Sequence, residues 1–237
     1  MRDLIQEMDY EKPIASGSWR YQRAGQATGK VETWRFTSAR DGFHVLRIDL
    51  DSNDPSNQEL LLFHLLLNPE MDIERAKFRY FASQSEIHGD LQFDKDGFSL
   101  NRLIVDRLEK KKKRHVEEII LETDAVFSVP SIAGLSLTAS RMRDDRRISI
   151  VTLDKKSAFT ARDDYTDFSY GEEEEWEVLR QEVVVRPCSI RWKEKETTLW
   201  LDRYNWPVEI RFSDGQTAAD AAYWRYQRIT NRSANPA

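Results

Sequence analysis

The stretch ERAKFRY, residues 74–80, alternates charged and apolar side chains, and this pattern decides the fold. Successive side chains of a β-strand point to opposite faces, so the alanine, phenylalanine and tyrosine of this stretch share one face. The segments HVLRIDL, residues 44–50, and EIHGDLQF, residues 86–93, alternate in the same way. Period-two alternation in three segments predicts an antiparallel sheet that buries one face.

The rest of the chain from Ser18 onward consists of short runs rich in β-branched and aromatic residues, separated by polar clusters that are typical of turns. Asp-Gly pairs at 41–42, 96–97 and 214–215 lie between such runs, where they suit the positive φ of tight hairpins. We expect fourteen strands, near residues 17–23, 30–38, 43–50, 59–67, 74–82, 86–93, 97–105, 115–123, 147–154, 174–186, 188–193, 196–203, 206–213 and 216–230.

Helical periodicity is scarce, which argues against the helical crossovers that parallel strands need. Residues 4–8 can form at most a short helix, and residues 129–142 form either a helical turn or a loop across the open side of the sheet. Residues 60–67 are apolar on both faces, so we expect a terminal segment or a second layer to cover their outer side. The sequence predicts an all-β fold, an antiparallel meander curved into a half-barrel or a spiral β-roll.

The chain of 237 residues is 40% hydrophobic, which is enough for a globular core, and no Pro/Gly/Ser-rich linker divides it. We therefore expect a single domain over residues 1–237. The pentapeptide WRYQR occurs at 19–23 and again at 224–228. Either the two copies occupy equivalent places in two similar halves, 1–127 and 147–237 with a connecting segment, or their strands pair with each other.

Composition restricts the partners and the compartment. The chain has 36 basic and 41 acidic residues, a net charge of −5, so it lacks an overall positive field and we expect no nucleic-acid partner. Cys188 is the single cysteine, which excludes an intramolecular disulfide and favours a reducing compartment. The N-terminal residues lack the apolar run of a signal peptide, and residues 60–67 are too short to cross a bilayer as a helix. We expect a cytoplasmic protein without a transmembrane segment.

Motifs for catalysis and metal binding are scarce. The four histidines lack the close spacing of a zinc site, and the sequence has neither a Gly-x-Ser-x-Gly motif nor a glycine-rich phosphate loop, so we expect no metal and no cofactor. Glu86, His88 and Asp90 share one strand face, which can bind a metal or orient an imidazole, although a solvated polar face is the simpler interpretation. His44 and His64 stand among apolar residues, either as hydrogen-bonded core histidines or as contacts to a ligand or a substrate.

Two runs of like charge stand out. Residues 110–114, KKKKR, lie between two expected strands, so they form either a solvated hairpin tip or a patch for anionic lipid head groups. The glutamates at 172–175 are typical of an exposed edge, because edge charges discourage pairing between molecules. Either run can guide the contact of a homodimer.

The seven tryptophans are the most informative feature of the composition. Most of them fall in expected strands, where they either fill the core or line a concave aromatic surface that suits an apolar ligand. The residues that we expect to line this surface are Trp19, Tyr21, Trp34, His44, Phe78, Tyr80, Trp200, Trp206 and Trp224.

The C-terminal part of the chain resembles a known family. TLWLD at 198–202 is followed by WPVEI at 206–210 and SDG at 213–215. This succession resembles the lipoprotein-carrier half-barrels of the LolA/LolB type and their uncharacterised bacterial relatives. The opening segments at 17–23 and 29–36 resemble the same group, and also a spiral β-roll family of glycolipid-binding proteins.

The resemblance implies a curved sheet whose concave apolar face holds a lipid or another hydrophobic molecule. It covers about a third of the chain, at its two ends, and residues 108–114 have no counterpart in it. The leader peptide of the exported carriers is also missing, so lipoprotein transport is not carried over.

Together, these features predict a non-catalytic protein that binds a lipid-like or other hydrophobic small molecule. Two alternatives stay open. One is an enzyme acting on a hydrophobic substrate, with His44 or His64 as the base and a nearby carboxylate to orient it. The other is a structural module that dimerises through an exposed edge strand, with its interior filled by its own aromatic side chains.

Overall fold

The computed structural model describes residues 7–54, 57–122, 125–142, 144–178, 180–193 and 195–225, where the chain forms sixteen strands and one α-helix, α1 (Ile132–Arg141). The short helix expected at residues 4–8 falls mostly outside these ranges. The strands of the first run are β1 (Lys12–Arg23), β2 (Gln26–Ser38), β3 (His44–Asp54), β4 (Asn57–Leu67), β5 (Ile73–Ala82), β6 (Ser85–Phe93), β7 (Gly97–Asp106) and β8 (Lys111–Ile120). Those of the second run are β9 (Val126–Ser128), β10 (Arg146–Asp154), β11 (Thr160–Tyr170), β12 (Glu174–Val178), β13 (Gln181–Trp192), β14 (Lys195–Asp202), β15 (Pro207–Phe212) and β16 (Gln216–Arg225).

All sixteen described strands belong to one curved sheet, whose order is β8 to β1 followed by β16, β15, β14, β13, β11, β10 and β9, while β12 pairs with β13 off this path. The first run proceeds outward from β1 to β8, and the second run returns from β9 to β16, which pairs with β1. Neighbours are antiparallel except β9 and β10. The predicted all-β antiparallel meander is confirmed, with the sheet left open between β8 and β9.

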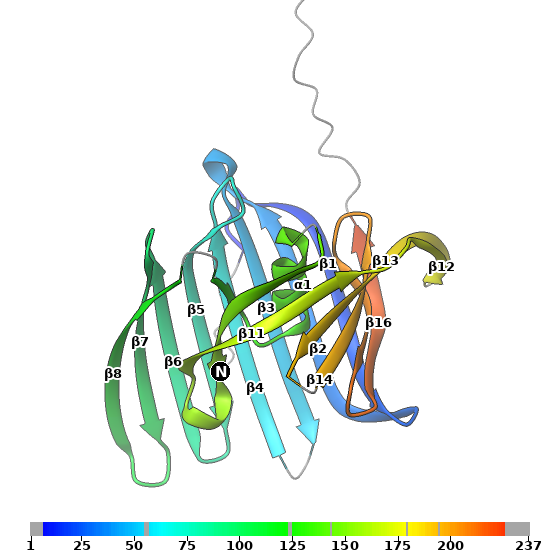
Figure 1. Ribbon diagram of the computed structural model, residues 1–237. Coiled ribbons are helices and arrows are strands. Elements are labelled where there is room, and N and C mark those ends of the chain that lie inside the picture. Colours follow the sequence, from blue (N-terminus) through cyan, green and yellow to red (C-terminus); the bar gives the residue numbers. More distant parts are fainter. Residues whose placement is uncertain are drawn as a thin grey trace, which may run out of the picture.

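The sheet folds over itself and encloses α1. In Figure 1, β11 and β13 cross in front of the strands of the first run, and α1 lies among them. Phe159, in the turn between β10 and β11, packs on Phe78 of β5 with ring centroids 4.8 Å apart. One hydrophobic cluster contains buried side chains of both runs and of the helix. Residues 129–142, for which the sequence allowed either a helical turn or a loop, therefore contain a helix, and this helix lies within the core.

The predicted alternation of faces is confirmed in β5, where Ala76, Phe78 and Tyr80 are buried and face the core. In β4 the inner side chains are buried, whereas Leu66 on the outer side is 36% exposed. The segment before β1 lies beside this outer side, since Glu11 accepts two hydrogen bonds of 2.7 Å from Arg47. The expected cover over residues 60–67 is thus partial.

Three strand expectations are wrong. The expected strand at 174–186 is two strands, β12 and the start of β13, and β13 continues through Pro187. β11 was not expected, because its sequence TARDDYTDFSY is polar on both faces. β8 begins at Lys111, so most of the basic run lies in the strand, and only Lys110, with φ of 55°, belongs to the turn.

The Asp-Gly turns are confirmed at two of three places. Asp41 and Gly42 have φ of 57° and 78°, and Gly215 has φ of 75°. Gly97 does not have positive φ; a Cβ there would lie 2.0 Å from the carbonyl oxygen of Ile119. Glycine is needed at this position for close approach of two strands rather than for a turn.

The two WRYQR copies lie on neighbouring strands, because β1 pairs with β16. They are offset, since Trp19 faces Asp220 and Trp224 faces Ser16. Residues 226–228 of the second copy lie outside the described residues. Among the described residues, no helix has the length and apolar character that crossing a lipid bilayer requires.

Candidate functional site

A cavity of about 320 Å³ lies where the two runs of strands meet the start of α1. β1 and β2 contribute to its wall from the first run, and β9, β10, β11, β13, β15 and α1 contribute from the second. Most of the wall is apolar, and its principal apolar side chains are Ile132, Leu135, Ile150, Leu153, Ile190 and Phe212. The volume is near the lower end of the roughly 300–1,000 Å³ of small-molecule sites, so the cavity suits a small ligand.

Glu32 fixes the helix beside this cavity. Its side chain is fully buried and accepts hydrogen bonds from the backbone N–H groups of Ile132 and Ala133, at 3.0 and 2.9 Å, and from the Tyr21 hydroxyl at 3.0 Å. The first N–H groups of a helix have no partner within the helix, and they attract negative charge. Burial raises the pKa of Glu32, while these hydrogen bonds act in the opposite direction.

Two hydroxyls in the cavity wall have no hydrogen-bond partner in the described part of the chain. Ser128 and Thr166 are 2% and 1% exposed, and the hydroxyl oxygen of each is buried. Leaving such a group unpaired costs about 1–3 kcal/mol, so buried hydroxyls normally find a partner. Both residues belong to the cavity wall, but their hydroxyl oxygens have almost no accessible surface, so they lie just behind the surface that a ligand would touch.

Three basic side chains also line the cavity. The Lys30 ammonium lies 4.0 Å from the centre of the Tyr21 ring, and burial lowers its pKa. Lys155 is paired with Glu59. Arg162 is exposed and has no ion-pair partner within the described ranges. The cavity therefore combines apolar walls with basic groups, of which Arg162 forms no ion pair within the described ranges but lies near enough to Asp154 for its charge to act on that carboxylate.

The expected aromatic residues form a stacked row rather than a cavity wall. Trp34 stacks between Trp19 and Trp206, with ring centroids 5.6 and 4.5 Å away. Phe36 lies between Trp206 and His44, and its ring centroid is 4.9 Å from that of Trp206 and 5.2 Å from that of His44. Trp19 is completely buried and Trp34 is 3% exposed, so this row fills the core.

The other expected site residues are dispersed. Phe78 and Tyr80 both contact Phe159, with ring centroids 4.8 and 5.2 Å away. Trp200 belongs to a separate small cluster, where it stacks on Trp176 at 5.4 Å. The side chain of Trp224 lies outside the described residues. Of the nine expected residues, Tyr21 is the one that lines the cavity, with the other eight in the aromatic row, elsewhere in the core, or not described.

His44 and His64 lie on opposite faces of the sheet. His44 stacks on Phe36 in the core, its Nδ1 has no partner in the described structure, and burial lowers its pKa. His64 is on the outer face, where burial together with the charges of Arg47 and Arg79 lowers its pKa to about 4. Within the described residues, no carboxylate is hydrogen-bonded to either ring.

The polar set on β6 is held by internal contacts. His88 Nε2 lies 2.5 Å from a Glu86 oxygen, and Asp90 accepts two hydrogen bonds from Arg75. No group of three or more potential metal ligands occurs in the described part of the chain. Of the other hollows, one of about 510 Å³ near Asp72 and Asp94 is lined by several charged side chains, and one of about 320 Å³ combines apolar side chains with His64 and His88.

Sequence reasoning missed the cavity, because part of its wall comes from α1 and β11, which the periodicity did not assign, and because its other strands are distant in the sequence. A local signal existed for the helix: Ser131 accepts a hydrogen bond of 2.9 Å from the N–H of Gly134, as a helix N-cap does. For β11, the polar residues Arg162 and Thr166 face the cavity and hide the usual apolar pattern.

Comparison with protein-family models, curated proteins and solved structures found no match to this chain. The resemblance to lipoprotein carriers and glycolipid-binding proteins therefore stays a prediction. Arguments about function rest on the cavity and its neighbours.

Proposed function

We propose that the protein binds a small lipid-like or otherwise hydrophobic molecule in the interior cavity and does not change it chemically. The observation that carries this proposal is the composition of the wall, which is mainly apolar and includes two buried hydroxyls without partners, Ser128 and Thr166. Apolar walls with a few polar groups are typical of small-molecule sites. The volume of about 320 Å³ favours a ligand with one chain or ring system over a lipid with two long chains.

The ligand class is the one that the family resemblance implies, but the site is different. The aromatic row around Trp34 is packed against itself, whereas the cavity lies at the start of α1. Among the residues that the structure describes, no histidine or cysteine lines the cavity, so the enzyme alternative has less support there. A cytoplasmic location is part of the proposal and rests on the single cysteine, Cys188, a buried thiol whose pKa is raised to about 11 by burial.

A second candidate function, self-association, is favoured by the sequence of β8. This strand ends the sheet on one side, and Val116 and Ile120 on it are 61% and 87% exposed. Two copies of β8 paired antiparallel about His115 would place Lys112 opposite Glu118 on one face of the joint sheet. Such opposite-charge pairs stabilise strand pairing, and a twofold dimer would contain each pair twice.

The binding proposal is tested by native mass spectrometry of the protein purified from its own host cells, followed by organic extraction. We expect a stoichiometric apolar species that is lost on extraction. Leu135→Trp, which fills the cavity, should abolish the bound species, whereas Leu66→Trp on the outer face of β4 should not. A clean apo mass together with no binding across a panel of lipids would overturn the proposal.

A further inference from the structure

Three polar residues of the cavity wall lie in one row across three neighbouring strands. Thr152 of β10 is in register with Ser128 of β9 on one side and with Arg162 of β11 on the other. Residues paired in register share a face, and neighbouring strands are about 4.8 Å apart. All three residues belong to the cavity wall, so Arg162 and Thr152 lie side by side at one end of it, with Ser128 next to Thr152.

Two members of this row have unused hydrogen-bonding capacity. The Ser128 hydroxyl is buried without a partner in the described structure. Arg162 has no ion pair there, and its guanidinium can donate several hydrogen bonds in a planar arrangement. A guanidinium beside hydroxyl donors is suited to a carboxylate or a phosphate group.

The charge around the row is positive. Lys30 and Lys155 line the same cavity, and they lie close enough for Lys155 to lower the pKa of Lys30. Among the described wall residues, Asp154 is the acidic one. The hydrogen bonds that it accepts from the hydroxyl of Ser157 at 2.8 Å and from the backbone of Lys156 at 3.0 Å lower its pKa, and so does the charge of Arg162. Glu32 lies behind the wall, and its carboxylate already accepts three hydrogen bonds, from the Tyr21 hydroxyl and from two backbone N–H groups of α1.

We propose that the ligand of the cavity is an anionic amphiphile, whose carboxylate or phosphate group is bound by Arg162 at the position of Thr152 and Ser128. This inference rests on the proposed binding function and adds the chemical class of the ligand. The apolar part of the ligand extends along β11 toward Thr166, which is four residues from Arg162, about 13 Å at roughly 3.3 Å per residue. Ile150 and Ile190 flank this path.

The test compares ligands that differ in head group, namely octanoate, octyl phosphate, octanol and octylamine, by calorimetric titration of the full chain. We expect octanoate and octyl phosphate to bind at least tenfold more tightly than octanol, and octylamine to bind most weakly. The affinity of the two anions should fall as the salt concentration rises, because salt screens the attraction to the basic groups. The ratio between octanoate and octyl phosphate distinguishes a fatty acid-like ligand from a phosphate-bearing one.

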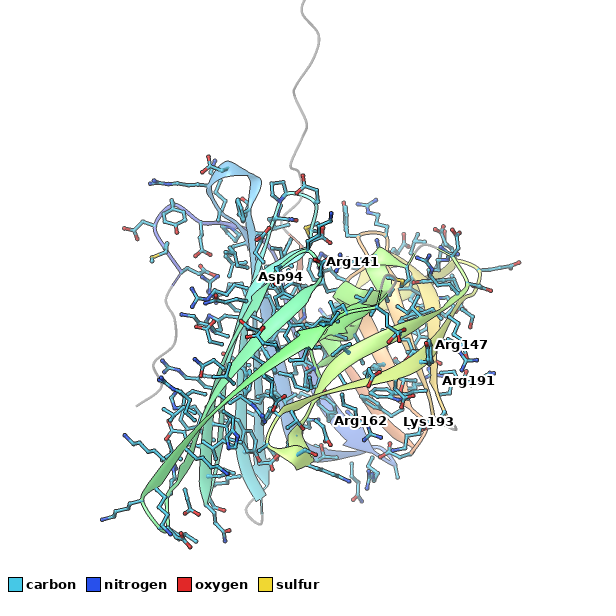
Figure 2. The ribbon with its side chains drawn as sticks, turned by 60° about the vertical axis from the view of Figure 1, so that its left-hand side comes forward. Asp94, Arg141, Arg147, Arg162, Arg191 and Lys193 are labelled. Carbon is cyan, nitrogen blue, oxygen red and sulfur yellow. The ribbon has the colours of Figure 1, made fainter. Side chains whose placement is uncertain are left out.

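Variants test whether the preference for anionic ligands comes from the row of Ser128, Thr152 and Arg162. Arg162→Gln should weaken octanoate binding about tenfold and leave octanol binding unchanged, and Ser128→Ala should act in the same direction with a smaller loss. Arg191→Gln is the matched control, because Arg191 is an exposed arginine on the same group of strands and does not line the cavity (Figure 2).

The outcomes separate the two proposals. Equal affinity for octanoate and octanol would overturn the anionic assignment while leaving the binding function in place. Equal effects of Arg162→Gln and Arg191→Gln on octanoate would also overturn it, since the selectivity would then come from the overall charge. Absence of binding by all four probes, together with an apo mass for the native protein, would overturn the binding function itself.

Discussion

Glu32 shows how one residue connects the sheet to the helix. Its two carboxylate oxygens receive three hydrogen bonds, two from the N-terminal backbone of α1 and one from Tyr21 of β1. A fully buried carboxylate is costly unless it is hydrogen-bonded, and here the donors are ones that the helix could not satisfy by itself. The residue thereby determines where α1 begins, and with it the position of the cavity wall.

Replacing this carboxylate by an amide tests the arrangement. In Glu32→Gln, the amide NH₂ group must face one of the two helix N–H groups, so we expect a loss of about 1–3 kcal/mol in the free energy of unfolding, measured with urea. Glu182→Gln, which changes an exposed glutamate on β13, is the control and should have little effect.

The pH dependence of this difference follows from the raised pKa of Glu32. Between pH 4.5, its ordinary value, and the higher pKa in the folded protein, the native state binds more protons than the unfolded state. The free energy of unfolding of the wild type therefore falls as pH rises through this window, and the contribution is absent in Glu32→Gln. The stability difference between the two proteins should shrink with rising pH. A difference that stays constant from pH 4.5 to neutrality would contradict the assignment.

At the scale of the element, β8 combines an open sheet edge with the sequence KKKRHVEEII. Its two ends have opposite charge, so pairing of two copies in parallel would set lysine against lysine. Antiparallel pairing about His115 instead sets Lys112 against Glu118 and Lys113 against Glu117. Charge thus selects one of the two directions in which this edge can pair.

Charge exchange on β8 tests the second candidate function. We expect the wild type to form a dimer at high concentration in sedimentation velocity, and Glu118→Lys to weaken this dimer at least tenfold. The double variant Lys112→Glu/Glu118→Lys restores complementary pairs and should restore the dimer. A wild type that stays monomeric up to its solubility limit would exclude the pairing.

The elements differ in how well their sequences predict them. β5 and β6 follow the period of two because one face is in the core and the other in water. β11 lacks the pattern since Arg162 and Thr166 occupy its inner side, and β12 merges with β13 in the sequence because the two strands are separated by a very short turn. A strand whose inner side carries polar residues, as β11 does, is therefore less visible in the sequence than a strand whose inner side is apolar.

At the scale of the whole molecule, both runs of strands contribute to one hydrophobic cluster. Phe159 of the second run packs on Phe78 of the first, and Phe127 packs on Phe98 at 5.3 Å. The sequence predicts a curved meander but not which strands meet across it, because contacts between distant strands leave no periodic trace. For the same reason, the aromatic residues were identified as important while the cavity was not.

The shared core predicts that the chain unfolds as a single domain. Urea unfolding followed by far-UV circular dichroism and by tryptophan fluorescence should give coincident transitions. Trp176→Phe removes a ring from the separate small cluster around Trp200, and it should leave this coincidence intact. Two separate transitions would show that the two runs of strands are independent domains.

The pairing of β1 with β16 also has a consequence for synthesis on the ribosome. β1 can pair with β2 as soon as both have emerged, but its other edge has to wait for β16, which comes last in chain order among the described strands. During translation, the first run therefore exposes an unpaired strand in what later becomes the interior of the sheet. An unpaired edge can form hydrogen bonds with a strand of another chain. The nascent chain is therefore more prone to aggregation before β16 has left the exit tunnel than afterwards.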